Sequence, residues 1–367
     1  MKLRYKILNG LVGFFVLSIV VLTLVLSHSS PCEPLEGDAV KGQTMQAIVG
    51  RCYGSADILE LETLPRPMVS KNEVLVKIKA AAVNPLDWHY MRGSPYLMRL
   101  VSGIGKPKDV SVGVDFSGVV EAVGDEVTRF SPGDEVFGGA SGAFAEYIVV
   151  TDERAVVHKP DSVSFVQAAA LPIAAITALQ AVRDKAGVKP GDRVLVNGAS
   201  GGVGTYAVQI AKAYGAQVTG VCSTRNVELV QSLGADRVID YKKASYAEDE
   251  AVYDVIIDMV GNHSMTANKN VLVPGGKLVM VGGPKGNWIA PLINPLKAMF
   301  MKPFVDREFT TLLATMNQPD LTTLGELMEQ GKLVSVIDRS FALRQVPAAI
   351  RYSESGRARG KIIIDMQ

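Results

Sequence analysis

Short apolar runs separated by glycine and proline dominate the chain between residues 45 and 163. Runs of this kind, rich in valine, isoleucine and aromatic residues and bounded by turn residues, predict short β-strands. The strands are expected at Ala47–Val49, Glu73–Ile78, Asp115–Val123 and Ala143–Val150. We therefore predict a compact, mainly β domain over residues 45–163.

Beyond residue 163 the pattern alternates between buried strands and helices. Continuous β-branched runs are typical of parallel strands that are covered on both faces. They occur at Val194–Val196, Gln217–Cys222, Asp254–Met259 and Gly276–Val281, and Ala207–Ala213 has helical spacing. The pattern predicts an α/β fold with a doubly wound parallel sheet over residues 164–310. The C-terminal segment, residues 311–367, is expected to complete the edge of this sheet and to return to the first domain.

A glycine-rich turn lies between the first of these strands and its helix. The turn contains Gly198, Ser200, Gly201, Gly202, Val203 and Gly204. Small residues allow the backbone to approach a pyrophosphate closely, and the N-terminus of the helix offers unpaired N–H groups. Because the turn is set between two strands and a helix, it predicts a dinucleotide-binding site. The alternative is a turn kept only for tight packing of the strand on the helix.

The residues after the second strand indicate which dinucleotide to expect. A carboxylate at this place usually binds the ribose 2′-hydroxyl of NADH. Here the strand ends in Cys222, Ser223, Thr224 and Arg225, without a carboxylate. Hydroxyls and a guanidinium suit a 2′-phosphate, so we predict NADPH as the cofactor. Alternatively, Arg225 is a solvated surface charge.

The N-terminus has a different pattern. Residues 1–8 carry three basic side chains, and Leu11–Leu26 is mostly apolar. We predict an uncleaved single-pass transmembrane anchor over residues 9–27, in preference to a removed signal peptide, and a linker over residues 28–44. The basic flank favours export of the body. Because NADPH is a cytosolic cofactor, we nevertheless expect a membrane protein whose body faces the cytosol.

Composition narrows the functional classes. The 367 residues carry a formal net charge of +1, and the pI is about 7.7, so no basic surface for nucleic acid is expected. The chain has three cysteines, Cys32, Cys52 and Cys222, without a C-x-x-C pair. This spacing gives neither a zinc-ribbon pattern nor a disulfide framework, and we predict ordinary thiols.

Several motifs occur together and in a fixed order: GVDFSGVVEAVG, SPGDEVFG, FAEYIVV, GASGGVG, LGADRVIDY and SGRARGKIII. On these motifs, Met45–Asp365 resembles the medium-chain dehydrogenase/reductase superfamily and is most similar to its zinc-free quinone oxidoreductase-like branch. The resemblance implies a GroES-like catalytic domain at residues 45–163 and a Rossmann domain at residues 164–310.

The resemblance also bears on metal binding. Zinc-dependent members use a Cys followed closely by an Asp, and a Gly-His-Glu, where this chain has Asn84-Pro85-Leu86-Asp87 and Gly113-Val114-Asp115. A catalytic zinc needs three protein ligands, and the Cys and the His are absent from these positions. We therefore expect no metal. Without a Lewis acid, hydride transfer favours quinones, or enones and enals, as acceptors.

The resemblance further implies a cleft between the two domains. Its catalytic side would be lined by Asn84, Asp87, His89 and Tyr90, with His89 as a candidate proton donor. Alternatively, Asp87 and Arg92 form a structural pair and His89 has no chemical role. Besides the glycine turn, the cofactor side would use Ser223 and Arg225 for the 2′-phosphate, Tyr241 at the adenine end, and Val260, Gly282 and Gly283 at the nicotinamide, with Asn262, His263 and Lys361 as secondary candidates.

The leading interpretation is a zinc-independent, NADPH-dependent oxidoreductase whose acceptor is a lipophilic small molecule. A membrane-attached NADPH-binding sensor without turnover is the main alternative, and a zinc-dependent alcohol dehydrogenase is less favoured. The resemblance is consistent with a homodimer. Acceptor specificity is expected to depend on two loops, Pro95–Lys108 and Gly286–Phe304.

Overall fold

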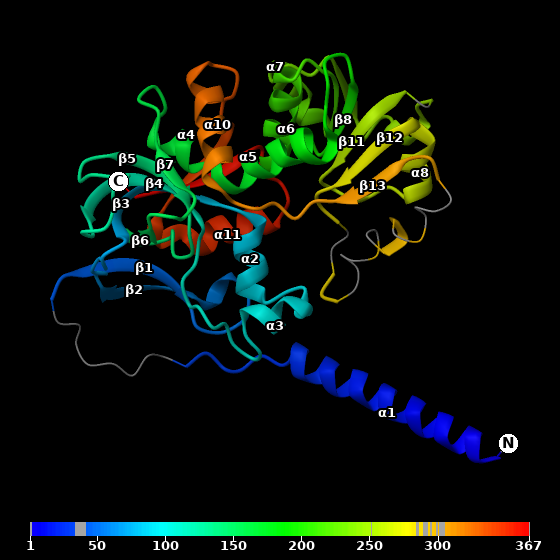
Figure 1. Ribbon diagram of the computed structural model, residues 1–367, viewed down its shortest axis with the longest axis horizontal. Helices are drawn as coiled ribbons and strands as arrows, with labels where there is room; N and C mark the ends of the chain where they lie inside the picture. Colours follow the sequence, from blue (N-terminus) through cyan, green and yellow to red (C-terminus); the bar gives the residue numbers. More distant parts are fainter. Residues whose placement is uncertain are drawn as a thin grey trace.

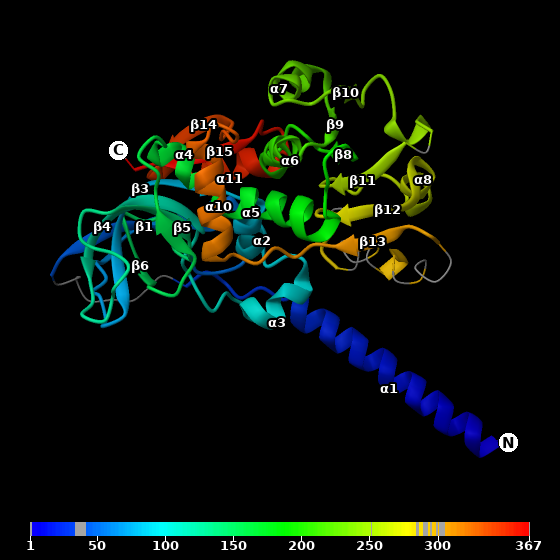
Figure 2. The same ribbon diagram turned by 45° about the horizontal axis from the view of Figure 1, so that its top comes forward.

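The body of the protein contains a seven-stranded sheet, a six-stranded sheet and a two-stranded ribbon, with helices between and around them (Figures 1 and 2). The computed structural model describes residues 2–33, 42–250, 252–283, 286–288, 293, 296–298, 300 and 305–366. Parts of the predicted linker at 28–44 and of the predicted loop at 286–304 lie outside these residues.

The seven-stranded sheet combines strands from both ends of the body. Its strand order is β14-β15-β3-β4-β5-β7, and β6 also pairs with β3. The strands are β3 (Glu73–Val83), β4 (Asp115–Val123), β5 (Glu135–Gly139), β6 (Tyr147–Thr151), β7 (Val156–His158), β14 (Ile337–Ala342) and β15 (Lys361–Asp365). The separate ribbon consists of β1 (Thr44–Gly50) and β2 (Leu59–Pro65). The C-terminal strand β15 pairs antiparallel with β3, so the end of the chain lies inside the β-rich part.

The six-stranded sheet is parallel throughout the described pairs. Its order is β10-β9-β8-β11-β12-β13, which is the 3-2-1-4-5-6 order of a dinucleotide-binding sheet. The strands are β8 (Arg193–Asn197), β9 (Gln217–Cys222), β10 (Arg237–Asp240), β11 (Tyr253–Asp258), β12 (Leu272–Met280) and β13 (Glu308–Thr311). The GroES-like and Rossmann parts of the predicted fold are confirmed.

Helices cover both sheets and fill the space between them (Figure 2). They are α1 (Lys2–Ser27), α2 (Pro85–Arg92), α3 (Arg99–Ser102), α4 (Phe165–Ala169), α5 (Pro172–Leu179), α6 (Gly202–Ala213), α7 (Val227–Ser232), α8 (Met265–Val271), α10 (Gln318–Glu329) and α11 (Val346–Glu354), with short turns η1 (Ala56–Ile58), η2 (Tyr96–Met98), η4 (Thr224–Asn226), η5 (Tyr246–Glu248) and η7 (Leu343–Gln345). The π-helical turn η3 (Gln180–Ala186) continues α5. The domain boundaries at 45–163, 164–310 and 311–367 stay predictions.

Two hydrophobic cores explain why the strands lie where they do. The strand β8 is fully buried because Val194 and Val196 pack with α5 and α6, including Tyr206 of α6, whereas Leu195 packs in a separate core with Met265 of α8. In the other core, Phe116 of β4 packs with the buried face of α11, which includes Ile350. Continuous apolar runs are therefore placed in strands covered on both faces.

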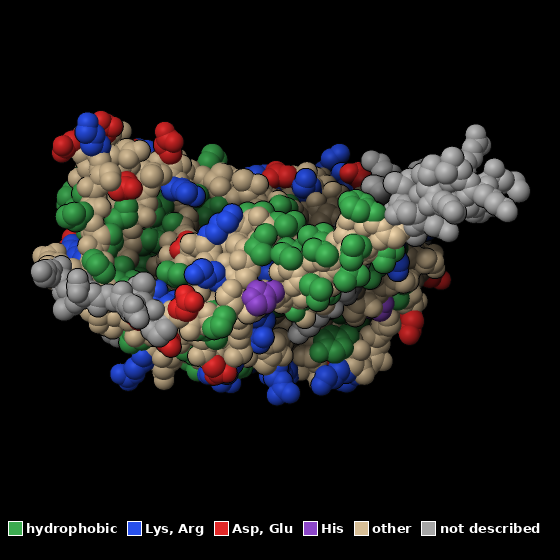
Figure 3. Space-filling view, turned by 90° about the horizontal axis from the view of Figure 1, so that it is seen from below, with side chains coloured by type: hydrophobic (Ala, Val, Ile, Leu, Met, Phe, Trp, Pro, Cys, Tyr) green, Lys and Arg blue, Asp and Glu red, His purple; other side chains and the backbone are tan. Residues whose placement is uncertain are grey.

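The N-terminal helix α1 extends away from the body, and its described part carries an exposed strip of hydrophobic side chains (Figures 1 and 3). Within the described part of the chain, no helix has both the length and the apolar character needed to cross a membrane. The apolar run Leu11–Leu26 measures about 24 Å as a helix, against a hydrocarbon core of about 30 Å. In addition, Leu26 is fully buried against the body. The single-pass anchor expected at residues 9–27, and the membrane localisation and orientation argued from it, are therefore wrong.

The chain after α1 is docked on the body and carries a disulfide. The amide of Ser30 donates to the carbonyl of Gly105 at 2.9 Å. Cys32 is bonded to Cys52, and only Cys222 is a free thiol among the described cysteines. The prediction of three ordinary thiols is wrong for the first two, because spacing along the sequence does not reveal that docking brings Cys32 beside Cys52.

Candidate functional site

The glycine turn follows β8 and leads directly into α6. Gly198 has a φ of +91°, which a residue with a side chain rarely adopts. A Cβ at Gly204 would lie 2.0 Å from the carbonyl oxygen of Gly198, so the helix starts against the turn itself. The first N–H groups of α6 have no partner within the helix. The turn therefore has the close-packed, N–H-rich form that a pyrophosphate requires.

The C-terminal strand reaches this turn from the other sheet. The amide of Gly360 donates to the carbonyl of Ser200 at 2.9 Å, and Gly201 and Gly360 form a parallel bridge. A Cβ at Gly202 would lie 3.3 Å from Cδ of Lys361. The predicted pyrophosphate turn and the residue Lys361 are therefore adjacent.

Two further turns, after β11 and β12, form the expected nicotinamide end. Asp258 is buried, and its Oδ1 accepts the amides of Val260 at 3.0 Å and Gly261 at 2.9 Å, and the side-chain amide of Asn197 at 2.8 Å. A side chain at Gly282 would start 2.1 Å from a backbone oxygen. Asp258, which sequence reasoning did not single out, thus fixes the turn that contains Val260. The sequence did offer one sign of this role, because Asp258 is a carboxylate at the end of an apolar β-strand.

At the end of the site where the 2′-phosphate is expected, two polar side chains already have hydrogen-bond partners within the protein. Thr224 donates to Asp240 at 2.7 Å, and the guanidinium of Arg225 donates to the carbonyl of Arg357. The side chain of Tyr241 is 59% exposed. Arg225 therefore lies beside the backbone of a second arginine, and a carboxylate, Asp240, lies on the neighbouring strand.

Buried Asn226 connects this end to the glycine turn. Its Nδ2 donates to Oγ of Ser200 at 2.9 Å and to Oγ of Ser223 at 3.2 Å. Its Oδ1 is buried without a hydrogen-bond partner. Because buried polar atoms are almost always paired, this oxygen favours a hydroxyl donor from a bound ligand. The predicted residues Ser200 and Ser223 are thus brought together, whereas Asn226 was missed.

On the opposite side, Asn84 and Asp87 start the helix α2. Asn84 is the N-cap, and its amide donates to Oδ2 of Asp87 at 2.7 Å. This is the backbone half of a capping box, and it holds the first turn of the helix. Both side chains are buried, and Oδ1 of Asp87 has no hydrogen-bond partner.

Asp115 and Lys361 complete a buried cluster with Asn84 and Asp87. Nζ of Lys361 donates to Oδ1 of Asn84 and lies 3.5 Å from Oδ2 of Asp115, which also accepts Nδ2 of Asn84 at 2.9 Å. Burial raises the pKa of Asp87 to about 7 and also raises the pKa of Asp115, while Lys361 opposes both effects. Burial lowers the pKa of Lys361. A single ammonium thus faces two carboxyls, of which Asp87 carries a proton over much of the neutral range.

The other predicted catalytic residues lie outside this cluster. Nδ1 of His89 is 2.6 Å from the carbonyl oxygen of Ser94, so Nδ1 carries the proton and Nε2 of the neutral ring is an acceptor. Burial lowers the pKa of His89, which opposes a role as proton donor at neutral pH. Tyr90 is 47% exposed. The alternative Asp87–Arg92 pair is wrong, since Arg92 binds Glu354.

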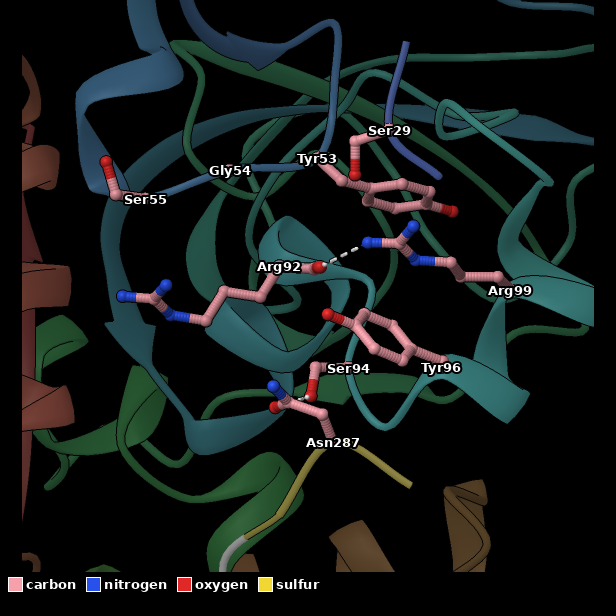
Figure 4. A pocket seen from close by; sticks show the side chains of 9 residues that line it. All are labelled: Ser29, Tyr53, Gly54, Ser55, Arg92, Ser94, Tyr96, Arg99 and Asn287. Atoms are coloured by element: carbon pink, nitrogen blue, oxygen red, sulfur yellow. Dashed lines mark hydrogen bonds between the residues drawn. The ribbon is translucent and has the colours of Figure 1, made fainter. Parts of the chain in front are cut away.

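A pocket of about 230 Å³ lies beside the C-terminal end of α2 (Figure 4). Its lining residues are Ser29, Tyr53, Gly54, Ser55, Arg92, Ser94, Tyr96, Arg99 and Asn287. Two loops expected to shape the acceptor site meet here, since the amide of Tyr96 donates to the carbonyl of Asn287 at 2.7 Å. Arg99 lies over the rings of Tyr53 and Tyr96, 4.4 and 4.7 Å from their centres. Sequence reasoning missed Arg99, because nothing local marks it.

No group of three or more His, Cys, Asp or Glu side chains within the described ranges is placed to hold a metal ion. Two family models match the chain. One is described as "Alcohol dehydrogenase GroES-like domain" and matches residues 70–161. The other is described as "Zinc-binding dehydrogenase" and matches residues 233–364, a range that contains neither Asn84 nor Asp115.

The sequences and structures of known proteins align with nearly all of the body. The chloroplastic quinone-oxidoreductase QR1 of Triphysaria versicolor is 36% identical over 88% of this chain and 99% of its own. The chloroplastic NADPH-dependent alkenal/one oxidoreductase of Arabidopsis thaliana is 33% identical over 89% of this chain and 81% of its own. The solved quinone oxidoreductase of Coxiella burnetii has a TM-score of 0.78 and 32% identity, covering 89% of this chain and 100% of that one. The chain therefore belongs to the medium-chain dehydrogenase/reductase superfamily, in its zinc-free quinone oxidoreductase-like branch.

Proposed function

We propose that this protein transfers hydride from NADPH to a quinone, or to the activated alkene of an enone or enal, without a metal. That it is an NAD(P)-dependent oxidoreductase follows from its family, and relatives with quinone and alkenal/one reductase names support the acceptor class. The observation that carries the proposal is the glycine turn after β8, which Gly360 joins to the buried cluster at the N-terminus of α2.

The residues present fit a dinucleotide. The turn lacks room for side chains at Gly198 and Gly204. Asn226, whose Nδ2 donates to the hydroxyls of Ser200 and Ser223, also offers an unpaired Oδ1. NADPH is favoured over NADH because Arg225 donates to the carbonyl of Arg357 through Nη2, while its other N–H groups can still donate to a 2′-phosphate.

When bound, the nicotinamide supplies the hydride. The protein itself orients the nicotinamide and the acceptor, and it excludes water from the site. Amides at the start of α6 would bind the pyrophosphate, and Asp258 would hold the turn at Val260 against the ring. Both N–H groups of the Asn84 side chain already have acceptors, Oδ2 of Asp115 at 2.9 Å and the carbonyl of Ala82 at 3.4 Å, and its Oδ1 accepts from Lys361. Asn84 therefore supports the site instead of binding the acceptor oxygen. The proton that completes the reduction comes from water or a hydroxyl.

The acceptor is a small molecule. A lipophilic acceptor was expected only because of the membrane anchor, and that anchor is wrong. The homodimer stays a prediction.

Purified protein tests the proposal in two steps. NADPH and NADH are first titrated by fluorescence, and NADPH absorbance is then followed after addition of duroquinone or of an enone. We expect tighter binding of NADPH and its consumption by at least one acceptor class. Tight binding without consumption would instead support a sensor, and no binding of either dinucleotide would overturn the proposal.

A further inference from the structure

Lys361 contacts both halves of the proposed site. On the cofactor side, the preceding residue Gly360 is hydrogen-bonded to Ser200, and Cδ of Lys361 lies 3.3 Å from the position of a Cβ on Gly202. Its aliphatic stem therefore packs against the glycine turn. The ammonium lies two bonds beyond Cδ, so rotation about the last side-chain bonds changes its distance from the turn.

On the acceptor side, the same ammonium holds Asn84. Nζ donates to Oδ1 of Asn84 and to the carbonyl of Val83 at 3.3 Å, and it lies 3.5 Å from Asp115. The side chain of Lys361 is only 3% exposed. Asn84 in turn caps α2 and donates its amide to Asp87. Any displacement of this ammonium thus removes a hydrogen bond from the side chain of Asn84, the residue whose backbone amide holds the start of α2.

We propose that Lys361 is a positioning residue that couples binding of the dinucleotide to binding of the acceptor. The inference rests on the proposed function, because it requires the pyrophosphate at the glycine turn. The structure shows one arrangement of the ammonium, shared by Asn84 and Asp115, and the proposal adds a second in which the ammonium is drawn toward an anion at the turn. In a buried site of low dielectric, a pyrophosphate attracts the ammonium strongly enough to shift this balance.

The coupling is reciprocal. If the dinucleotide draws the ammonium away, Asn84 loses a donor and α2 adopts the arrangement in which the acceptor binds. By linkage, the acceptor then strengthens dinucleotide binding by the same factor. An ordinary structural role for Lys361 would lower stability but would produce no such mutual effect.

The coupling can be measured without turnover by using two ligands that cannot react with each other. NADP⁺ and duroquinone are both oxidised, so no hydride moves between them. NADP⁺ is titrated by fluorescence with and without saturating duroquinone, on the full chain. We expect duroquinone to tighten NADP⁺ binding at least fivefold in the parent protein, near the lower end of typical couplings of about 5- to 150-fold.

Two variants test the role of Lys361. Lys361→Met keeps an apolar stem of similar length, and Lys361→Met combined with Asp115→Asn also avoids a buried unpaired carboxylate. Lys332→Met, at an exposed position, is the control. We expect the coupling to fall below twofold in both variants that change Lys361 and to stay at the parent value in the control. If Lys361→Met does not fold, the double variant decides.

The outcomes separate the two ideas. If parent protein binds NADP⁺ but duroquinone leaves its affinity unchanged, or if both Lys361 variants keep the full coupling, the inference is overturned while the proposed function stands. If parent protein binds no dinucleotide, the proposed function fails as well.

Discussion

The proposed preference for NADPH over NADH depends on a single side chain, that of Arg225. Its guanidinium lies at the carbonyl of Arg357, after β9. We expect Arg225→Ala to weaken NADPH binding about tenfold, or about 1.4 kcal/mol, because the guanidinium meets the 2′-phosphate. NADH lacks this phosphate, so its affinity should stay within twofold. Fluorescence titration checks both, with Lys185→Ala, an exposed basic residue before β8, as the control.

Equal losses for both dinucleotides would contradict this assignment. A loss confined to NADH would point instead to Asp240, whose carboxylate accepts a hydrogen bond from Thr224 on the neighbouring segment.

Asp87 makes stability depend on pH. Burial raises the pKa of its carboxyl to about 7, whereas the unfolded chain has the ordinary value of about 3.9. Between these values the folded protein binds a proton that the unfolded chain has lost. Stability therefore falls as pH rises from about 4 through 7. Asp87→Asn keeps an acceptor for the amide of Asn84 and does not titrate, so its stability relative to the parent should improve between pH 5 and 8.

The expected improvement is about 2–3 kcal/mol over this range, measured by urea unfolding at several pH values. Asp57→Asn is the control, since Asp57 is exposed and its hydrogen bond from Arg351 lowers the pKa of the carboxyl. That carboxyl is ionised throughout the range, so its variant should differ from the parent by a constant amount. A constant difference for Asp87→Asn would show that the carboxyl does not titrate there.

At the scale of elements, Arg99 of α3 holds the end of α1. Its Nη1 donates to the carbonyls of Leu26 at 3.0 Å and His28 at 2.7 Å, and its Nε donates to the carbonyl of Gly93 at 2.8 Å. A guanidinium suits these carbonyls because a helix C-terminus has unpaired acceptors and a negative dipole end. The contact is buried, since Arg99 is only 2% exposed.

We expect Arg99→Ala to release the end of α1 and to cost at least about 2 kcal/mol, because several buried acceptors lose their donor. Hydrogen exchange should become faster at the amides of His28 and Ser30, which bond to Leu24 and Gly105. Arg51→Ala, which removes an ion pair with Glu62, is the control that should leave these amides protected. Unchanged exchange in Arg99→Ala would show that the disulfide alone holds this segment.

Element positions were predictable where local pattern decides them. Asp115–Val123 and Gln217–Cys222 are strands with the predicted bounds. Gln217–Cys222 is mostly apolar, as expected for a parallel strand covered on both faces, and Asp115–Val123 is a short run rich in valine that ends before a glycine. The strand β14 (Ile337–Ala342) gives no such local signal, because no position of its sequence IDRSFA is fully buried. Its place is decided by pairing with β15, which no local pattern reveals.

The candidate site likewise has one part that a local sequence pattern predicts and another part that only the tertiary fold brings together. The glycine turn is a local signal, since its conformation requires the residue types themselves. The cluster of Asn84, Asp115 and Lys361 comes from three distant segments that meet only after β3, β4 and β15 pair. The Cys32–Cys52 bond likewise follows from docking, not from spacing. Contacts of this kind depend on the tertiary fold, which is why Asn226 and Arg99 were not found.

At the scale of the whole molecule, one contact joins the two sheets at the site. The end of the loop before β15 touches the glycine turn of the parallel sheet, while β15 itself pairs with β3 in the other sheet. Gly360 occupies this contact with a φ of +78°, and an added Cβ would lie 2.3 Å from the carbonyl oxygen of Val336. Any side chain here must push β14 or the turn aside.

Gly360→Ala should therefore lower both stability and cofactor affinity, whereas Gly356→Ala provides a matched control. Gly356 has a φ of +66° in the same segment, but an added Cβ there meets nothing within 4 Å. Its substitution costs only the left-handed strain of about 1–2 kcal/mol. Gly360→Ala adds overpacking, typically about 1–3 kcal/mol, and displaces the amide that bonds to Ser200. Urea unfolding should show a larger loss of stability for Gly360→Ala than for Gly356→Ala. NADPH titration should show a tenfold or greater loss of affinity for Gly360→Ala alone. Equal NADPH affinities in the two variants would mean that other contacts hold the two sheets together at the site.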